Sequence, residues 1–408
     1  MVSFSAEELS FLTSASGAQA LQRVQDRQRA GELQFSGSNS LASVATLRQE
    51  YGQMGRAIVE LLRAREVLGR KMPAPMAQAW LADQSAAEQA TPWAVAEFRA
   101  AHLHRVGVRT MADVTCSVGT ELAAGQAAVP DVVGSDVDDV RLRMARVNVP
   151  GVPVARADAT CPVWDVDAVV ADPGRRNSSG RVSRVENLQP PLPDLVGPWR
   201  QRGVELAVKC APGLDFTQVQ AWAGQIDVVS VDGAVKEACV YTPGLCAPGL
   251  GGTAPAGSPV RRAVVLGQRP VLLTSQDEQI EPEDRGPGEH GRFIVDPDGA
   301  IVRAGLVRHY AARHGLWQLD PRIAYLTGPR VPEGHRGFEV HEWVPMKKLK
   351  AALKARQAGA VEILVRGVDV NPDQLRKSLK LRGTQPWSVV LTRVGKSAVA
   401  YLCQPVTG

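Results

Sequence analysis

The stretch MADVTCSVGTEL at residues 111–122 decides the fold of this chain. A short apolar run ends in Asp113, passes through small residues and enters a segment of helical composition, which predicts a strand, a tight turn and a helix. In a Rossmann-like fold, the loop after the first strand lies at the carboxyl edge of the sheet, where the strand order reverses. Small residues in this loop let a ligand approach the backbone closely. The stretch therefore predicts the binding edge of a parallel sheet.

Around this stretch, short β-rich runs alternate with helical segments, a pattern typical of parallel βαβ units. The expected strands are residues 111–115, 131–135, 152–156, 167–171, 204–209, 227–231 and 262–267. One expected helix, at 137–149, places Val140, Met144 and Val147 on one apolar face. The predicted fold class is α/β, with a doubly wound, Rossmann-like sheet of seven strands.

The region that precedes the sheet has a different composition. Residues 1–103 are rich in Ala, Leu, Gln, Glu and Arg. Apolar residues recur in them at helical spacing, such as Leu41, Val44 and Leu47, and Ile58, Leu61 and Leu62. This region is therefore predicted to be helical. Its last helix is expected to begin with Thr91 as the N-cap and Pro92 in the first turn.

The region that follows the sheet begins with a linker or loop at 275–292, which is acidic, rich in Pro and Gly and without periodicity. A helix at about 299–314, several strands, two basic helices and a hairpin turned at Gly395-Lys396 then indicate a small α+β module. A chain of 408 residues exceeds what one core ordinarily spans. Three parts are predicted: a helical region at 1–103, the α/β domain at 104–274, and the linker with the α+β domain at 275–408.

Composition excludes several classes of protein. No run of about 18 uncharged apolar residues is present, so no membrane span is expected. Glu7 and Glu8 stand where a secretory signal carries positive charge, and the six cysteines form no CxxC pair, so we expect a cytoplasmic protein with buried, reduced thiols. The histidines lack zinc-ligand spacing, and no metal is predicted. Residues 341–408 contain 12 Lys and Arg against 4 Asp and Glu, an excess of +8 that makes nucleic acid a candidate partner.

An acidic residue follows each of the first four expected strands. These residues are Asp113, Asp136, Asp158 and Asp172. Each one taken singly is more often an N-cap or a turn residue. Because four successive strands bring an acid to the same predicted edge, we favour a shared ligand. Asp136 would accept hydrogen bonds from ribose hydroxyls, and Asp158 would accept one from the exocyclic amine of adenine.

The motifs DVTCSVGTEL (113–122), GSDVDD (134–139), RADAT (156–160) and DPGRR (172–176) resemble those of class I S-adenosylmethionine-dependent methyltransferases. From about Glu88 to its end, the chain is especially similar to a bacterial group with a C-terminal THUMP-like domain. The further motifs are EQAT (88–91), SVDGAVKEA (230–238), DPRIAYLTG (320–328) and the tail VRGVDVNPDQLRKSLKLRG (365–383). The same cofactor motifs are more distantly similar to the RNA-cap trimethylguanosine synthases.

The resemblance implies that S-adenosylmethionine is the cofactor and that residues after the first three strands bind it. These residues are Asp113, Thr115, Cys116, Ser117, Gly119, Asp136, Val137, Asp158 and Ala159. Asp113 would bind the ammonium group of the methionine part. Of the glycines usual after this first acid only Gly119 is present, with Thr115 and Ser117 at the other two places.

The resemblance places methyl transfer at Asp172 and Pro173, which match the residues that grip an exocyclic amine in relatives that methylate one. Gly174 departs from the second proline of that pattern. Arg175 and Arg176 would clamp a phosphate, although surface pairs of arginine are common.

Lys347, Lys348, Lys350 and Lys354 lie on the first of the two basic helices, which by itself is usually a solvated face. Because THUMP-related domains are implicated in RNA binding, the resemblance favours RNA as the partner, with tRNA and rRNA not distinguished and the oligomeric state not determined. Methylation of a small molecule in a closed apolar pocket is one alternative. RNA binding without catalysis, through a glycine loop that no longer holds cofactor, is another.

Overall fold

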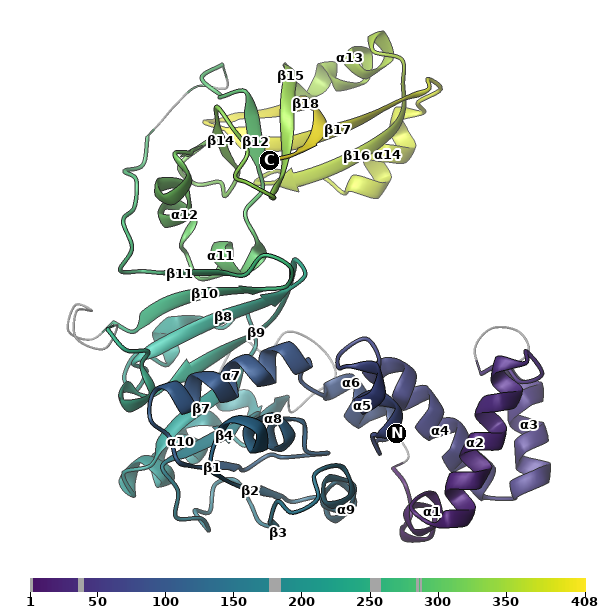
Figure 1. Ribbon diagram of the computed structural model, residues 1–408. Coiled ribbons are helices and arrows are strands. Elements are labelled where there is room, and N and C mark those ends of the chain that lie inside the picture. Colours follow the sequence, from purple (N-terminus) through teal and green to yellow (C-terminus); the bar gives the residue numbers. More distant parts are fainter. Residues whose placement is uncertain (1–2, 36–39, 176–184, 250–257, 284–285, 287) are drawn as a thin grey trace. The chain divides into compact units, whose positions relative to one another are not determined.

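The computed structural model describes residues 3–35, 40–175, 185–249, 258–283, 286 and 288–408 (Figure 1). The chain divides into two compact units. Unit 1 comprises Met1–Gln225 and Ala238–Pro259, and unit 2 comprises Ile226–Glu237 and Val260–Gly408. The chain passes between them three times, at 225/226, at 237/238 within strand β9 (Ala234–Tyr241), and at 259/260. The domain boundaries proposed at 103/104 and 274/275 stay a prediction.

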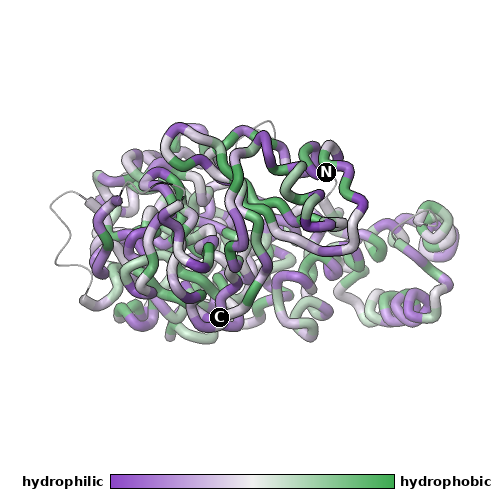
Figure 2. The backbone as a smooth tube through the Cα atoms, turned by 90° about the horizontal axis from the view of Figure 1, so that it is seen from above, coloured by the Kyte–Doolittle hydropathy of each residue, from purple (hydrophilic) through white to green (hydrophobic). Residues whose placement is uncertain are grey.

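Unit 1 begins with helices, as predicted for the N-terminal region. They are α1 (Ala6–Leu12), α2 (Ala15–Arg29), α3 (Ser40–Tyr51), α4 (Met54–Leu68), α5 (Ala74–Ala79), α6 (Gln84–Gln89) and α7 (Trp93–Arg105). Figure 2 shows hydrophilic and hydrophobic residues alternating along the N-terminal helices. Leu47, Ile58 and Leu61 are buried, whereas Leu41 is 82% exposed. The predicted apolar spacing therefore describes α4 well and α3 only in part.

The start of α7 lies one residue later than predicted. Pro92 is the N-cap residue and supplies no side-chain cap. Thr91, the predicted N-cap, is buried before the helix, and its hydroxyl accepts a hydrogen bond from Lys209 Nζ at 2.5 Å. A buried ammonium without partners costs far more than an uncapped helix amide, so this hydroxyl is used by the lysine.

The sheet of unit 1 contains the predicted parallel strands. They are β1 (Thr110–Asp113), β2 (Asp131–Asp136), β3 (Val154–Arg156), β4 (Ala168–Ala171) and β7 (Glu205–Cys210), in the order β3-β2-β1-β4-β7. Asp113 at the end of β1 lies in register with Gly134 of β2 and Val170 of β4. The carboxyl ends of these strands therefore meet at one edge, and the strand order reverses between β1 and β4.

Helices and a small ribbon connect these strands. The connecting elements are α8 (Thr120–Ala128), α9 (Asp139–Asn148), β5 (Gly174–Arg175), β6 (Leu188–Gln189) and α10 (Leu192–Gln201), with β5 and β6 antiparallel. The predicted apolar face of α9 is wrong at Val147, which is 50% exposed. Leu142, Met144 and Ala145 form the buried face instead, because α9 packs beside β2 and β3 through these residues.

All seven expected strands are present, and two further strands accompany them. The sixth expected strand is β8 (Gln225–Val231), and the seventh is β10 (Val260–Leu266). β10 lies between β8 and a further strand, β11 (Val271–Thr274). The unexpected strands are β9 and β11. In β9 the charged residues Lys236 and Glu237 interrupt the apolar run, which obscured the strand pattern.

The C-terminal part of unit 2 is an α+β module with its own seven-stranded sheet. Its strands are β12 (Phe293–Val295), β13 (Trp317–Gln318), β14 (Leu326–Gly328), β15 (Arg336–Pro345), β16 (Ala358–Arg366), β17 (Gln385–Val394) and β18 (Ser397–Thr407), in the order β13-β14-β12-β15-β18-β17-β16. Helices α13 (Leu349–Ala355) and α14 (Pro372–Leu379) pack on it through Leu349, Leu353 and Leu379. The predicted hairpin is confirmed, with Val394 opposite Ser397.

The helical segment between β12 and β13 differs from the predicted pattern at one point. The expected helix at 299–314 is split into α11 (Gly299–Arg303) and α12 (Val307–His314), because Gly305 adopts a φ of +70° that interrupts a helix. The described residues between 275 and 292 form no helix or strand, as expected for a linker or loop.

Gly119→Ala is expected to lower the melting temperature more than Gly107→Ala. Both glycines have a left-handed backbone, with φ of 93° and 92°, so an alanine costs about 1–2 kcal/mol of strain at either position. A Cβ on Gly119 would lie 2.9 Å from Val149 Cγ2, whereas one on Gly107 meets nothing within 4 Å. Thermal unfolding of both variants measures the difference, and equal shifts would contradict the steric argument.

Candidate functional site

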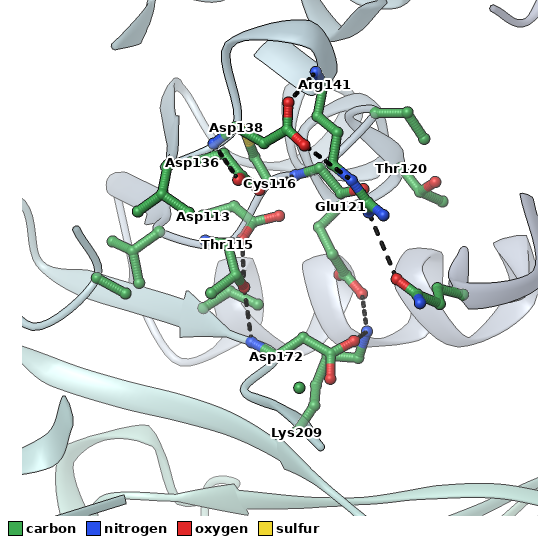
Figure 3. Close-up of a pocket in the computed structure, with 18 of the residues that line it drawn as sticks. Asp113, Thr115, Cys116, Thr120, Glu121, Asp136, Asp138, Arg141, Asp172 and Lys209 are labelled. Atoms are coloured by element: carbon green, nitrogen blue, oxygen red, sulfur yellow. Dashed lines mark hydrogen bonds and ion pairs between the residues drawn. The ribbon is translucent and has the colours of Figure 1, made fainter. Parts of the chain in front are cut away.

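A cavity of about 480 Å³ lies in unit 1 at the carboxyl ends of the parallel strands (Figure 3). The predicted cofactor residues that line it are Asp113, Thr115, Cys116, Ser117, Asp136, Val137, Asp158 and Ala159. Gly119 is not among the lining residues, and it acts instead as the left-handed residue that starts α8. Asp172 also lines the cavity. The sheet thus brings all four strand-end acids to one place.

Asp113 is the deepest of these acids. Its side chain is 2% exposed, and its Oδ1 accepts hydrogen bonds from the amide of Thr115 at 3.0 Å and from the hydroxyl at 3.3 Å. Burial, together with the negative charge of Glu121, raises the pKa of Asp113 to about 8. A positively charged ligand group would oppose both effects, so this position suits a cation.

The two residues that replace glycine in the loop after β1 each make a specific bond. The hydroxyl of Thr115 accepts a hydrogen bond from the amide of Asp172 at 2.7 Å, which ties the loop after β1 to the loop after β4. Ser117 adopts a φ of +48°, and its hydroxyl accepts a hydrogen bond from Arg141 Nη1 at 2.7 Å. Glycine has no side chain for either bond, which gives a physical reason for these departures.

Asp136 and Asp158 follow β2 and β3. The carboxylate of Asp136 accepts one hydrogen bond from the amide of Ser117 and one from the amide of Asp138, both at 2.9 Å. Each of its oxygens keeps a second lone pair, so further donors can bind. Asp158 is exposed, and its Oδ1 accepts hydrogen bonds from the amide and hydroxyl of Thr160.

The segment after β4 contains the predicted transfer residues. The side chain of Asp172 is 47% exposed and lines the cavity, while Pro173 is buried and does not line it. Gly174 of β5 lies at the cavity wall. The backbone of Arg175 continues β5, and Arg176 lies outside the described residues, so the predicted phosphate clamp stays a prediction.

Sequence reasoning missed a buried charged group at the cavity. Lys209 of β7 contacts Asp172 Oδ2 at 2.6 Å and Glu121 Oε1 at 3.5 Å, and Arg99 contacts the same Glu121 oxygen at 2.5 Å. Burial acts to raise the pKa of Glu121, but Arg99 and Lys209 outweigh it and lower the pKa below its ordinary value. The available signal was a lysine at the carboxyl end of the apolar strand VELAVK (204–209).

The predicted RNA-contacting lysines lie in unit 2. Lys347 and Lys348 form part of a short 3₁₀ turn before α13, and Lys350 and Lys354 lie on α13 itself. All four side chains are exposed. Trp387 is half-buried against the core under α13 and α14, as expected for a packing residue.

The sequence is 44% identical over 378 residues to the uncharacterized S-adenosylmethionine-dependent methyltransferases of Mycobacterium tuberculosis strains H37Rv and CDC 1551, covering 88% of this chain and 99% of each relative. The chain belongs to the S-adenosylmethionine-dependent methyltransferases. Residues 335–405 of this methyltransferase match the THUMP domain-like family. The crystal structure of a candidate methyltransferase from Porphyromonas gingivalis W83 has the same fold, with a TM-score of 0.70 at 19% identity over 99% of both chains.

The cavity of this methyltransferase fits S-adenosylmethionine, its methyl donor. Its volume of about 480 Å³ lies within the range of roughly 300–1,000 Å³ that small-molecule sites occupy. Its acids are acceptors that match the ammonium, hydroxyl and amine donors of that ligand. Thr115 and Ser117 direct their hydroxyls at protein partners, so the altered glycine positions are compatible with a ligand.

The described residues also bear on the predicted metal, membrane and thiol chemistry. Within them, no group of three or more His, Cys, Asp and Glu side chains is placed to hold a metal ion. None of the described helices has the length and apolar character that crossing a membrane requires. None of the six cysteines, all of which lie in the described residues, forms a disulfide, but Cys161 is exposed, because it lies in the turn after Asp158. The expectation of buried thiols is therefore wrong at Cys161, and Cys246 is only half-buried.

The stability gained through Asp113→Asn is expected to increase with pH. The folded-state pKa of about 8 exceeds the ordinary value of 3.8, so the folded protein holds the proton of Asp113 more tightly than the unfolded chain does. The stability of wild type that depends on this proton is fully present below about pH 4 and is lost as pH rises through 8. Asparagine cannot ionise. The melting temperature of D113N minus that of wild type should therefore rise from about pH 5 to about pH 9.

Gly107→Ala is the matched control for this measurement, because it changes no ionisable group and adds its Cβ in open space. Its difference from wild type should stay constant over the same pH range. A constant difference for D113N as well would contradict the raised pKa of Asp113.

Proposed function

We propose that this methyltransferase transfers the methyl group of S-adenosylmethionine to RNA, with the chemistry in unit 1 and RNA affinity supplied by the THUMP-like domain. The observation that carries the proposal is a set of exposed cations in that domain. They are Lys347, Lys348, Lys350, Lys354, Lys377, Lys380 and Arg382. Exposed cations that neutralise phosphates provide most of the sequence-independent affinity for nucleic acid.

The pairing of charges in the domain supports this assignment. Arg356, Arg366 and Arg376 form ion pairs with acidic side chains at 2.5–2.8 Å. The lysines of α13 have no such acidic partner within the part of the chain that the structure describes. Cations without an acidic partner remain available to phosphates, whereas paired arginines have part of their charge neutralised.

For the methyl donor, we assign Asp113 to the ammonium group, Asp136 to the ribose hydroxyls and Asp158 to the adenine amine. The raised pKa of Asp113 favours a cationic partner, and Asp136 keeps free lone pairs for two hydroxyl donors. Val137 is an apolar side chain left 58% exposed, as expected for a contact with a flat apolar ring. The loop residues Thr115, Cys116, Ser117 and Gly119, together with Ala159, shape the remaining walls.

For the acceptor, we assign Asp172 and the backbone of Pro173. S-adenosylmethionine supplies an activated methyl group on a sulfonium centre. The protein then needs to hold an acceptor amine in line with that methyl group, which is catalysis by proximity and orientation. The half-exposed carboxylate of Asp172 is positioned to accept a hydrogen bond from such an amine. Arg175 and Arg176, next in the chain, remain proposed phosphate contacts.

Asp136→Ala is expected to weaken binding of S-adenosylhomocysteine by about 1–3 kcal/mol, because hydrogen bonds to a charged acceptor are removed. Calorimetric titration measures this change. Asp139→Ala is the matched control, since Asp139 is an acid of α9 that pairs with Arg143 and does not line the cavity. Equal reductions of affinity in the two variants would remove the ribose assignment from Asp136.

The RNA assignment is tested with labelled S-adenosylmethionine, total cellular RNA and nucleoside analysis. Wild type should label a nucleoside. Replacing Lys347, Lys348, Lys350 and Lys354 with Gln should weaken RNA binding across unrelated sequences and lower the salt slope by roughly 0.7–0.9 for each phosphate that is no longer neutralised. The affinity for S-adenosylhomocysteine should not change, because these lysines lie in unit 2.

A control variant with the same change in charge carries Gln at Arg23, Arg70, Arg200 and Lys236, which are exposed residues outside the THUMP-like domain. It should keep the wild-type salt slope. Equal slopes for all three proteins would mean that the lysines of α13 form only a solvated face, and the absence of any labelled nucleoside with wild type would favour a small-molecule acceptor.

A further inference from the structure

Lys209 occupies an unusual place for a lysine. It is the next-to-last residue of β7, where its neighbours Val208 and Cys210 are buried, and it is itself only 6% exposed. A buried ammonium is unfavourable unless charged and polar partners surround it. Its side chain also lines the cavity, so its partners lie at the site of the chemistry.

The partners of Lys209 come from three different segments. Its Nζ lies 2.6 Å from Asp172 Oδ2, 2.5 Å from the Thr91 hydroxyl and 3.5 Å from Glu121 Oε1. Figure 3 shows Glu121 and Asp172 converging on this ammonium. Glu121 is in turn held by Arg99, which is 2% exposed. The result is a row of alternating charge that runs from the buried Arg99 to the half-exposed Asp172.

Two contacts restrain Asp172, and one of them comes from this row. The amide of Asp172 donates to the Thr115 hydroxyl at 2.7 Å, and its Oδ2 is held by Lys209. The second carboxylate oxygen, Oδ1, has no hydrogen bond to any part of the chain that the structure describes. A carboxylate fixed in this way presents one acceptor oxygen in one orientation.

We propose that Lys209 is a positioning residue that holds the Asp172 carboxylate in one orientation, so that its Oδ1 selects an acceptor that donates an N–H hydrogen. The proposal rests on the role assigned to Asp172 under the proposed function. Lys209 is assigned no role as a base, because its Nζ already donates to the Asp172 carboxylate and the Thr91 hydroxyl and contacts Glu121.

A double-mutant cycle separates this role from a merely structural one. Lys209→Met and Asp172→Asn should each lower kcat by on the order of 10- to 100-fold, the reduction expected when an acceptor is misplaced. If Lys209 acts through Asp172, the double variant should be no slower than the slower single variant. The proposal would be overturned if the fold reduction of kcat in the double variant equalled the product of the two single reductions, or if K209M kept the wild-type kcat.

Two further measurements identify the role. The KM for S-adenosylmethionine and the affinity for S-adenosylhomocysteine should change less than about twofold in K209M, because Asp172 positions the acceptor and not the donor. Lys209→Arg keeps the charge and should retain more of kcat than K209M. If K209M does not fold, K209R and D172N are combined in the double-mutant cycle instead. A K209R variant in which kcat and donor affinity fall by the same factor would also overturn the proposal.

A readout without any acceptor distinguishes this proposal from the assignment of RNA. The ¹H–¹⁵N signal of the Lys209 ammonium, followed by NMR, should shift in Asp172→Asn and stay unchanged in Asp158→Asn, which alters another acid of the same cavity. If wild type labels no RNA but this shift occurs, only the RNA acceptor fails. If the signal does not respond to D172N, the role of Lys209 is overturned whatever the acceptor.

Discussion

Parallel pairing of β1 with both β2 and β4 is the constraint on which the rest of the site depends. Because parallel strands end at the same edge, this pairing brings Asp113, Asp136 and Asp172 together although they are far apart in the chain. The register also aligns the loops, so that the Thr115 hydroxyl reaches the amide of Asp172. A slip of one residue would turn each strand-end side chain to the opposite face of the sheet.

The second organising feature is the balance of buried charge beneath the cavity. Asp113 and Glu121 are both buried acids, but their environments act in opposite directions. Arg99 and Lys209 lower the pKa of Glu121 despite its burial, whereas burial and the charge of Glu121 raise the pKa of Asp113 to about 8. One acid is therefore committed to holding protein cations, and the other suits the positive charge of a ligand.

The two units differ in how their charged groups are exposed to solvent. Unit 1 contains the cavity, where removal of water strengthens electrostatic contacts with a small ligand. Unit 2 carries exposed lysines on a folded module that matches the THUMP domain-like family, and exposed charge acts over a larger area and depends on salt. The charged contacts at the cavity of unit 1 are therefore strengthened by burial, whereas the lysines of unit 2 stay exposed to solvent.

The sequence by itself predicted the parallel sheet, the family and a set of residues that line one cavity, because strand periodicity and strand-end acids are local patterns that topology brings to one edge. It did not predict strand β9, the exposure of Val147 or the hydrogen bond between Thr91 and Lys209, since each depends on a neighbour distant in the chain. Only the tertiary structure joined Arg99, Glu121, Lys209 and Asp172 into one row. Burial makes such charges depend on one another, and no spacing along the chain records which buried charges will meet.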